Sequence, residues 1–271
     1  MKINWFPGHM KKTMDEIKAK LVNIDVVIYL LDSRAPVSSI NPSLSKLSQN
    51  KPVLYVFNKV DLADEERVKT IAKDYKGEKC DYILLNSIQS GSSKALKGKL
   101  LALANDKIER YKKKGIRAVI RAIVIGVPNS GKSTLVNNLV GKAKAVTGNR
   151  AGVTKMTQWV SIGDNIEICD TPGTLYPNLA DQDVAKKLLF MGSVKDEVVA
   201  DTVELAMELI ALIDEKYPGL LQTRYGEDIS LEGIAKKRGF VISKGEYDIE
   251  RSANAVIDDF RKGRIGKITL D

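Results

Sequence analysis

An eight-residue segment, Gly126-Val-Pro-Asn-Ser-Gly-Lys-Ser133, constrains the fold of this 271-residue chain more than any other feature. It follows the apolar run 118–125, which is typical of a buried parallel strand, and it leads into a helical pattern at 131–140. A strand, a glycine-containing loop and a helix in this order form a phosphate-binding loop, because backbone N–H groups and the helix N-terminus then face the phosphates. The chain must therefore build a largely parallel sheet with helices packed on it.

The rest of the chain agrees with this architecture. Further apolar runs predict strands at 25–32, 53–57, 82–85, 158–162 and 165–169. Helical patterns lie between them at 10–24, 64–76 and, as one long helix, about 93–114. After Pro177 only helical patterns remain. We therefore expect an α/β domain at 1–178 with a mostly parallel sheet covered by helices, followed by a smaller all-helical C-terminal domain at 179–271.

The eight-residue segment assigns chemistry to its own residues. Lys132 is expected to reach the outer phosphates, and the Ser133 hydroxyl is expected to ligate Mg²⁺. The loop and the first helical turn supply the other predicted phosphate contacts, namely Asn129, Ser130, Gly131 and Thr134.

A second motif, Asp170-Thr-Pro-Gly173, follows the predicted strand 165–169. Asp170 is expected to hold the hydration shell of Mg²⁺, and the Gly173 N–H to sense the terminal phosphate. Thr154, in the polar loop 148–155, is a candidate second protein ligand to the metal.

A base-recognition motif, Asn58-Lys-Val-Asp61, follows the predicted strand 53–57. The Asp61 carboxylate can accept two hydrogen bonds from guanine, whereas adenine has no matching pair of donors. Asn58 is expected to brace the loop and contact the base edge, and the Lys59 stem to lie along the ring. Asn86-Ser87, after the next strand, is a weaker candidate for contact with the guanine oxygen. Asn and Asp also favour plain turns, so each motif gains weight only from the others.

The base-recognition residues precede the phosphate loop, which reverses the usual order. This order, with Trp5-Phe-Pro-Gly-His-Met10 at the start and Phe260-Arg-Lys-Gly-Arg-Ile-Gly266 near the end, resembles the circularly permuted GTPases. The likeness covers essentially the whole chain and is greatest to the bacterial ribosome biogenesis GTPase A type. It implies a P-loop GTPase domain that hydrolyses GTP to GDP and phosphate. It also implies a cytoplasmic factor in late maturation of the large ribosomal subunit, with binding to ribosomal RNA and hydrolysis stimulated by the subunit.

Two residues, Thr174 and His9, are candidates for activating the attacking water. Many GTPases place a glutamine after the Asp-x-x-Gly glycine, but this chain has Thr174 there, where the resembling family usually has a bulky apolar residue. A threonine hydroxyl can hold a water, although it is short. His9 is the only histidine, and the resemblance implies a catalytic role for it; otherwise it merely begins the first helix. Asn129 matches the asparagine of potassium-dependent GTPases, which makes K⁺ a possible second cation.

The formal net charge of +9 is unevenly distributed. Residues 1–179 contain 29 lysines and arginines against 16 acidic residues, whereas residues 180–271 contain 14 against 18. In the densest cationic stretch, 97–121, the only acidic residues are Asp106 and Glu109. This excess indicates a polyanionic partner such as nucleic acid, although an ordinary lysine-rich surface has the same composition.

Composition also bears on localisation. Cys80 and Cys169 are the only cysteines and lie far apart, which fits a reduced cytoplasmic protein better than a disulfide or zinc site. No segment has the roughly 18 apolar residues of a membrane helix, and the N-terminal residues do not match a secretory signal. We expect no membrane contact, and the oligomeric state stays open.

Two other functions are compatible with these motifs. A metabolic P-loop kinase would also need the phosphate loop, but Asn58 to Asp61 and the lack of a lid-like arginine cluster argue against it. A GTP-dependent RNA-binding switch without meaningful turnover also fits, because the missing glutamine predicts slow intrinsic hydrolysis.

Overall fold

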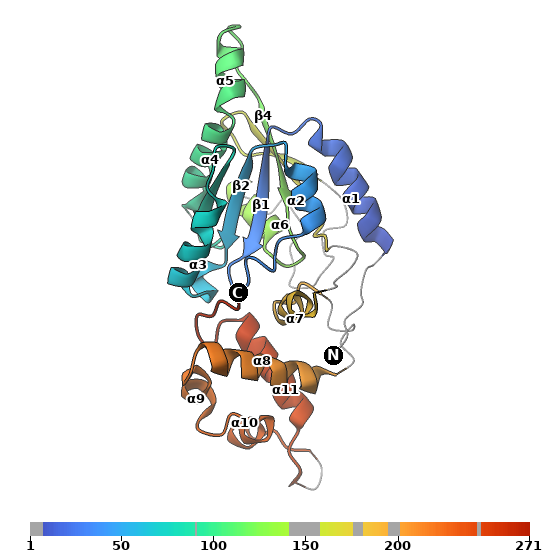
Figure 1. The fold of residues 1–271 in the computed structure, drawn as a ribbon, viewed down its shortest axis with the longest axis vertical. Coiled ribbons are helices and arrows are strands. Elements are labelled where there is room, and N and C mark those ends of the chain that lie inside the picture. Colours follow the sequence, from blue (N-terminus) through green and yellow to red (C-terminus); the bar gives the residue numbers. More distant parts are fainter. Residues whose placement is uncertain (1–7, 90, 141–157, 176–180, 195–200, 243–244) are drawn as a thin grey trace.

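A six-stranded sheet in the order β3-β2-β1-β4-β6-β5 forms the centre of the molecule (Figure 1). The computed structural model describes residues 8–89, 91–140, 158–175, 181–194, 201–242 and 245–271, with 8–10, 92 and 158 described by backbone alone. The strands are β1 (Val26–Asp32), β2 (Val53–Asn58), β3 (Cys80–Leu84), β4 (Ile120–Ile125), β5 (Gln158–Ser161) and β6 (Ile166–Asp170). Neighbouring strands are parallel except β5, which pairs antiparallel with β6.

Helices follow most of the strands. Those of the sheet-forming part are α1 (Gly8–Leu21), α2 (Pro42–Ser48), α3 (Glu65–Ala72), α4 (Ser92–Leu103), α5 (Asn105–Lys112) and α6 (Lys132–Val140), with short 3-10 turns at Val60–Leu62 and Lys73–Tyr75. Those after the sheet are α7 (Gln182–Phe190), α8 (Thr202–Lys216), α9 (Leu220–Tyr225), α10 (Leu231–Arg238) and α11 (Ile249–Arg261).

The side chains of β4 point alternately to the two faces of the sheet and show which helices cover each face. Ile120, Ala122 and Val124 pack in a cluster with residues of α4 and α6, whereas Ile123 and Ile125 pack in a cluster with residues of α1, α2 and α3. Because successive side chains of a strand point to opposite faces, the apolar strand buries both faces at once.

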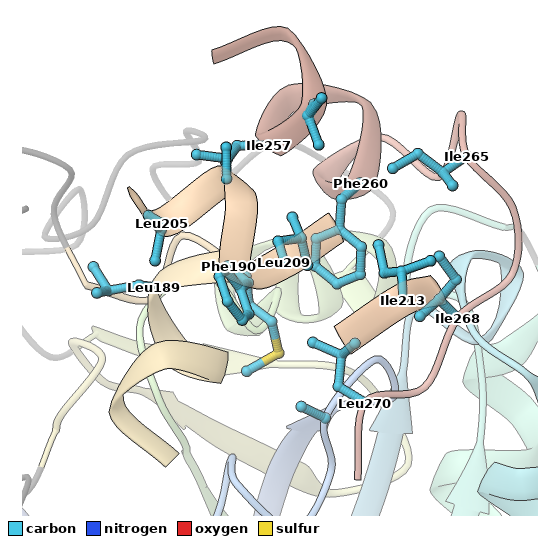
Figure 2. Packing of buried hydrophobic residues seen from close by; sticks show 14 of the residues in the cluster. Leu189, Phe190, Leu205, Leu209, Ile213, Ile257, Phe260, Ile265, Ile268 and Leu270 are labelled. Carbon is cyan, nitrogen blue, oxygen red and sulfur yellow. The ribbon is translucent and has the colours of Figure 1, made fainter. Parts of the chain in front are cut away.

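A third hydrophobic cluster lies at the end of the sheet to which the strands β1 and β2 point (Figures 1 and 2). It joins α7 to α11 with Ala35, Val127 and Leu175, which belong to the loops after β1, β4 and β6. The C-terminal residues return to the same loops, since the Leu270 N–H donates to the Arg34 carbonyl at 2.7 Å. The helical part is therefore packed on the loops that follow the strands. The predicted boundary at 178 lies outside the described residues, and the division into two domains stays a prediction.

One predicted element is wrong. The single helix expected at 93–114 is two helices, α4 and α5, because Ala104 leaves the helical region with φ −94° and ψ 8°. Asn105 and Asp106 follow, and both residue types compete with helical hydrogen bonds. None of the described helices is long and apolar enough to span a bilayer.

Candidate functional site

The carboxyl ends of β1 and β4 mark the point where the strand order reverses. From β1, the strands β2 and β3 extend the sheet on one side, while β4, β6 and β5 extend it on the other. Open parallel sheets bind ligands at such a switch point. The phosphate loop follows β4, and Asp32, Asn58 and Asp170 end β1, β2 and β6. The predicted phosphate, metal and base motifs therefore meet at one edge.

The phosphate loop needs glycine at two crowded positions. Gly126 has φ 150°, and a Cβ there would lie 2.4 Å from the Leu30 carbonyl oxygen. Gly131 has φ 101°, and a Cβ there would lie 2.3 Å from the Asn58 amide nitrogen. A side chain at either position would push the loop away from β1 or from the base-recognition motif.

Lys132 folds back over this loop from the start of α6. Its Nζ donates to the carbonyl oxygens of Val127 at 2.7 Å and Gly126 at 3.2 Å, and the residue is only 6% exposed. Burial lowers the pKa of Lys132 to about 8, although the Asp170 carboxylate opposes this shift. A buried ammonium whose hydrogen bonds in the described part of the chain go to neutral carbonyls favours an anionic ligand. Thr134 follows in the first turn of the helix.

Ser133 and Asp170 form the predicted metal pair. The Ser133 hydroxyl donates to one Asp170 oxygen, Oδ2, at 2.8 Å. The other oxygen, Oδ1, is buried and has no hydrogen-bond partner among the described residues. Burial raises the pKa of Asp170, and the Ser133 hydrogen bond opposes the shift. A buried carboxylate oxygen without a donor, beside a hydroxyl oxygen, suits a hard divalent cation such as Mg²⁺. Thr154 lies outside the described residues.

Gly173 and Thr174 bring the segment after β6 against the phosphate loop. A Cβ on Gly173 would lie 2.5 Å from the Pro128 Cα and 3.0 Å from the Lys132 Nζ. The Thr174 N–H donates to the Gly126 carbonyl at 3.2 Å. The Thr174 side chain is buried, and its hydroxyl has no hydrogen-bond partner within the described part of the chain. The predicted catalytic threonine thus keeps an unused hydroxyl, but it does not face solvent.

Asn58 braces three loops at once. Its Nδ2 donates to the Ser130 carbonyl at 2.7 Å, and its Oδ1 accepts from the Ser87 N–H at 2.9 Å and the Ser87 hydroxyl at 2.8 Å. Asn86 turns its own loop by accepting the Ile88 N–H at 2.9 Å. Asp61, in the turn Val60–Leu62, is exposed. The brace leaves the Asp61 carboxylate exposed, and its contact with guanine stays a prediction.

Lys59 connects the base-recognition motif to the phosphate loop and to β1. It adopts the left-handed conformation, with φ 62°. Its Nζ donates to the Asn129 carbonyl at 2.5 Å and to the Asp32 carboxylate at 2.8 Å. The ammonium of Lys59 is therefore anchored on both neighbouring loops, and the contact of its stem with the guanine ring stays a prediction.

The sequence analysis missed Asp32 and Arg34. Arg34 is 2% exposed and binds Asp32 through two nitrogens, Nε at 2.9 Å and Nη2 at 2.6 Å. Burial alone would raise the pKa of Asp32, but the charges of Arg34 and Lys59 outweigh it and hold the pKa well below the ordinary value. A carboxylate ending an otherwise apolar strand was the signal available in the sequence.

The same arginine reaches the C-terminal helices. Arg34 Nη1 donates to the Arg261 carbonyl at 3.1 Å, and Arg261 donates to the carbonyls of Phe190 at 3.0 Å and Leu189 at 2.7 Å. The ends of α7 and α11 are thus tied to the end of β1. Nothing in the local sequence pattern predicts this connection.

The structure describes the side chain of the candidate potassium ligand, Asn129, but only the backbone of the candidate catalytic histidine, His9. Asn129, with φ 58°, donates through Nδ2 to the Gly192 carbonyl at 2.5 Å, so its amide points toward the residues after α7. His9 lies in the first turn of α1, and its side chain is outside the described residues. Because α1 runs opposite to β1, this first turn lies toward the same end of the sheet as the carboxyl end of β1, to one side of the strands (Figure 1).

Comparison with known proteins agrees with this geometry. A family model described as a 50S ribosome-binding GTPase matches residues 121–238. The ribosome biogenesis GTPase A of Bacillus cereus is 37% identical over 279 residues, covering 100% of this chain and 94% of that protein. The ribosome biogenesis GTPase A of Thermotoga maritima is 32% identical over 273 residues, covering 99% and 94%.

Solved structures give the same result. GNP-bound YlqF from T. maritima matches with a TM-score of 0.65 and 28% identity, covering 96% of this chain and 97% of that chain. The GDP-bound structure of TM YlqF matches with a TM-score of 0.64 and 29% identity, covering 94% and 98%. The expected P-loop GTPase fold and GTPase function are thereby confirmed. Identity of this extent along the whole chain shows that it belongs to the ribosome biogenesis GTPase A family.

Proposed function

We propose that this GTPase acts late in maturation of the large ribosomal subunit, binds its ribosomal RNA and hydrolyses GTP slowly until the subunit stimulates it. The observation that carries the hydrolytic part is the pair of Ser133 and the buried Asp170, whose side-chain oxygens lie 2.8 Å apart, together with the buried Lys132. The description of the matching family model, a 50S ribosome-binding GTPase, supports the large subunit as partner. We also propose that the second predicted domain, residues 179–271, contacts RNA or the ribosome.

The residues divide the chemistry among themselves. Ser133, Asp170 and Thr154 are the protein groups that would hold Mg²⁺, which supplies positive charge to the phosphates when bound. Lys132 places its ammonium on the outer phosphates, where charge develops as the terminal phosphoryl group leaves. The Gly173 N–H donates to the terminal phosphate and makes the segment after β6 sensitive to its presence.

Two residues are proposed to orient the attacking water. His9 does so through its imidazole, from the first turn of α1 at the carboxyl end of the sheet. Thr174 does so through the hydroxyl that has no partner among the described residues. Slow turnover without a partner follows from the absence of a glutamine at this position.

The central experiment measures GTP hydrolysis at saturating nucleotide, alone, with purified large subunits and with purified small subunits. We expect the large subunit alone to raise the rate. An unchanged low rate with bound GTP would instead favour the non-enzymatic RNA-binding switch. Phosphate transfer to a small acceptor, with no preference for guanine over adenine, would favour the kinase.

Two finer assignments belong with this proposal. We infer a cytoplasmic protein, because Cys80 and Cys169 are both free thiols. We also keep K⁺ as a possible cofactor held by Asn129, although its amide nitrogen binds Gly192 in this structure. Equal hydrolysis rates in K⁺ and Na⁺ would remove that assignment.

A further inference from the structure

An exposed tryptophan lies on the edge strand of the sheet. Trp159, in β5, is 44% exposed, whereas tryptophan is usually highly buried. The next residue, Val160, is 8% exposed and packs in the core. Trp159 is paired with Cys169, whose side chain belongs to the cluster on the α1 face, so the indole is on that face of the sheet.

Two cations flank this indole. Lys20 Nζ, from α1, and Arg121 Cζ, from β4, each lie 6.0 Å from the ring centre. Glu167 holds the arginine in place, since its Oε2 accepts from Arg121 Nε at 3.0 Å. An exposed ion pair of this kind adds little stability, so its main consequence is the position of the guanidinium. At 6.0 Å from the ring centre, both cations lie at the distance of about 6 Å within which a positive charge is attracted to an aromatic ring, so they are held beside the indole.

The cationic helix α5 contacts the start of β4, the strand that carries Arg121. Lys107 Nζ, from α5, donates to the Val119 carbonyl and to an Asp25 carboxylate oxygen, both at 2.7 Å. That carboxylate oxygen also accepts the Arg121 N–H at 2.8 Å. Exposed cations continue from there along α5 and the following loop, at Arg110, Lys112, Lys113, Lys114 and Arg117.

We propose that Trp159, Lys20 and Arg121 form a stacking site for an unpaired base of single-stranded RNA, with the two cations on its phosphates. The inference rests on the proposed function, which makes RNA the partner. An aromatic ring offers a stacking surface for any base, and the lysine and arginine beside it can bind the phosphates of the same strand. Duplex RNA keeps its bases stacked on one another and cannot use such a site, so the site selects single strands.

Fluorescence of the indole tests this directly. The chain has two tryptophans, so a Trp5→Phe protein reports on Trp159 alone. We expect oligouridylate, which has little structure of its own, to quench this emission, and duplex RNA to leave it unchanged. Trp159→Leu should weaken oligouridylate binding, followed by fluorescence anisotropy, about tenfold, whereas Trp5→Leu should not. Lys20→Gln and Arg121→Gln should each lower the dependence of log Kd on log salt concentration by about 0.7.

Basal GTP hydrolysis of Trp159→Leu should equal that of the unaltered protein, because the indole lies outside the nucleotide site. Oligouridylate that binds without quenching Trp159, and equally well to Trp159→Leu, would overturn the site. Quenching of the Trp159 emission by anionic lipid vesicles, but not by oligouridylate, would also overturn the site. If large subunits still stimulate hydrolysis in that case, the proposed function stands while this surface assignment fails.

Discussion

The side-chain amide of Asn129, in the phosphate loop, donates to the carbonyl oxygen of Gly192, after α7, at 2.5 Å. Gly192 in turn lies against Arg261, since a Cβ on it would be 3.3 Å from the arginine Nε. The phosphate loop is therefore bonded to the helical part of the chain directly, in addition to the connection from Asp32 through Arg34 to Arg261. The loop that is predicted to bind phosphate therefore also contacts the helical part of the chain.

Replacing Asn129 by glycine should release this contact without distorting the loop. Glycine adopts φ 58° freely, whereas alanine would be strained there. We expect faster amide hydrogen exchange in residues 188–194 and a loss of about 1 kcal/mol in the free energy of unfolding. The control is Asn138→Ala, in α6, whose amide binds the Gln89 carbonyl at a distance from α7. Unchanged exchange in 188–194 would show that the contact does not hold the helical part.

Guanine selectivity should depend on Asp61. Asp61→Asn removes the carboxylate that accepts from guanine, and the exposed position makes a folding defect unexpected. Because a hydrogen bond to a charged group contributes about 1.5–3 kcal/mol, we expect GTP affinity to fall at least about tenfold. Inosine triphosphate, which lacks the 2-amino group, should bind the variant as well as GTP does. The control is Glu66→Gln, which removes the charge of an exposed carboxylate in α3 and should preserve the preference for GTP. Titration calorimetry with GTP and inosine triphosphate distinguishes the two variants.

Acid should destabilise the helical part through Asp259. This carboxylate is 1% exposed and accepts from Arg224 at 3.0 Å and from Tyr225 at 3.0 Å, with Arg238 and Arg264 also paired to it. Burial opposes ionisation, but these partners together lower the pKa of Asp259. Since the folded-state pKa is below the unfolded value, this stabilisation is complete above about pH 4 and is lost as the pH falls further.

Asp259→Asn should therefore cost about 3 kcal/mol of unfolding free energy at neutral pH, and less near about pH 3. The neighbouring Asp258, which pairs with Lys262 and Arg264 at 45% exposure, is the matched control. Asp258→Asn should change stability by less than about 0.5 kcal/mol at either pH. Denaturant midpoints at the two pH values give the comparison, and equal losses for both variants at neutral pH would contradict the prediction.

The two candidate water-orienting residues can be separated by paired variants. Thr174→Val keeps the buried shape but loses the hydroxyl that has no partner among the described residues. If Thr174 orients water, the single-turnover hydrolysis rate falls about 100-fold while GTP affinity is kept. His9→Ala should instead lose subunit-stimulated turnover with normal binding. Full stimulated rates in both variants would show that neither residue orients the attacking water. Measuring the GTP affinity of each variant as well distinguishes a loss of catalysis from a loss of binding.

Local sequence determined most of the sheet and its motifs. The run 25–32 predicts β1 because a strand covered on both faces must be apolar at every position. The segment Gly126 to Ser133 predicts its own loop, because left-handed and crowded backbone positions accept glycine. Asn58 and Asp61 could be predicted as site residues because they directly follow a strand, and loops at the carboxyl ends of parallel strands bind ligands. The binding and catalytic roles of all these residues stay predictions, and the side chains of Thr154 and His9 lie outside the described residues.

Tertiary structure alone decided the connections between distant segments. Arg34 meets Arg261 across 227 positions in the chain, and Asn129 meets Gly192 across 63. No periodicity or turn preference encodes such a pair, because its geometry depends on how the third hydrophobic cluster seats the helices on the sheet. The exposure of Trp159 could not be predicted from the sequence either. An apolar residue in a strand is expected to be buried unless the strand is known to lie at the edge of the sheet, and only the structure shows that β5 is an edge strand. The sequence thus specified the loops that are predicted to hold nucleotide, and tertiary packing specified which distant segments those loops contact.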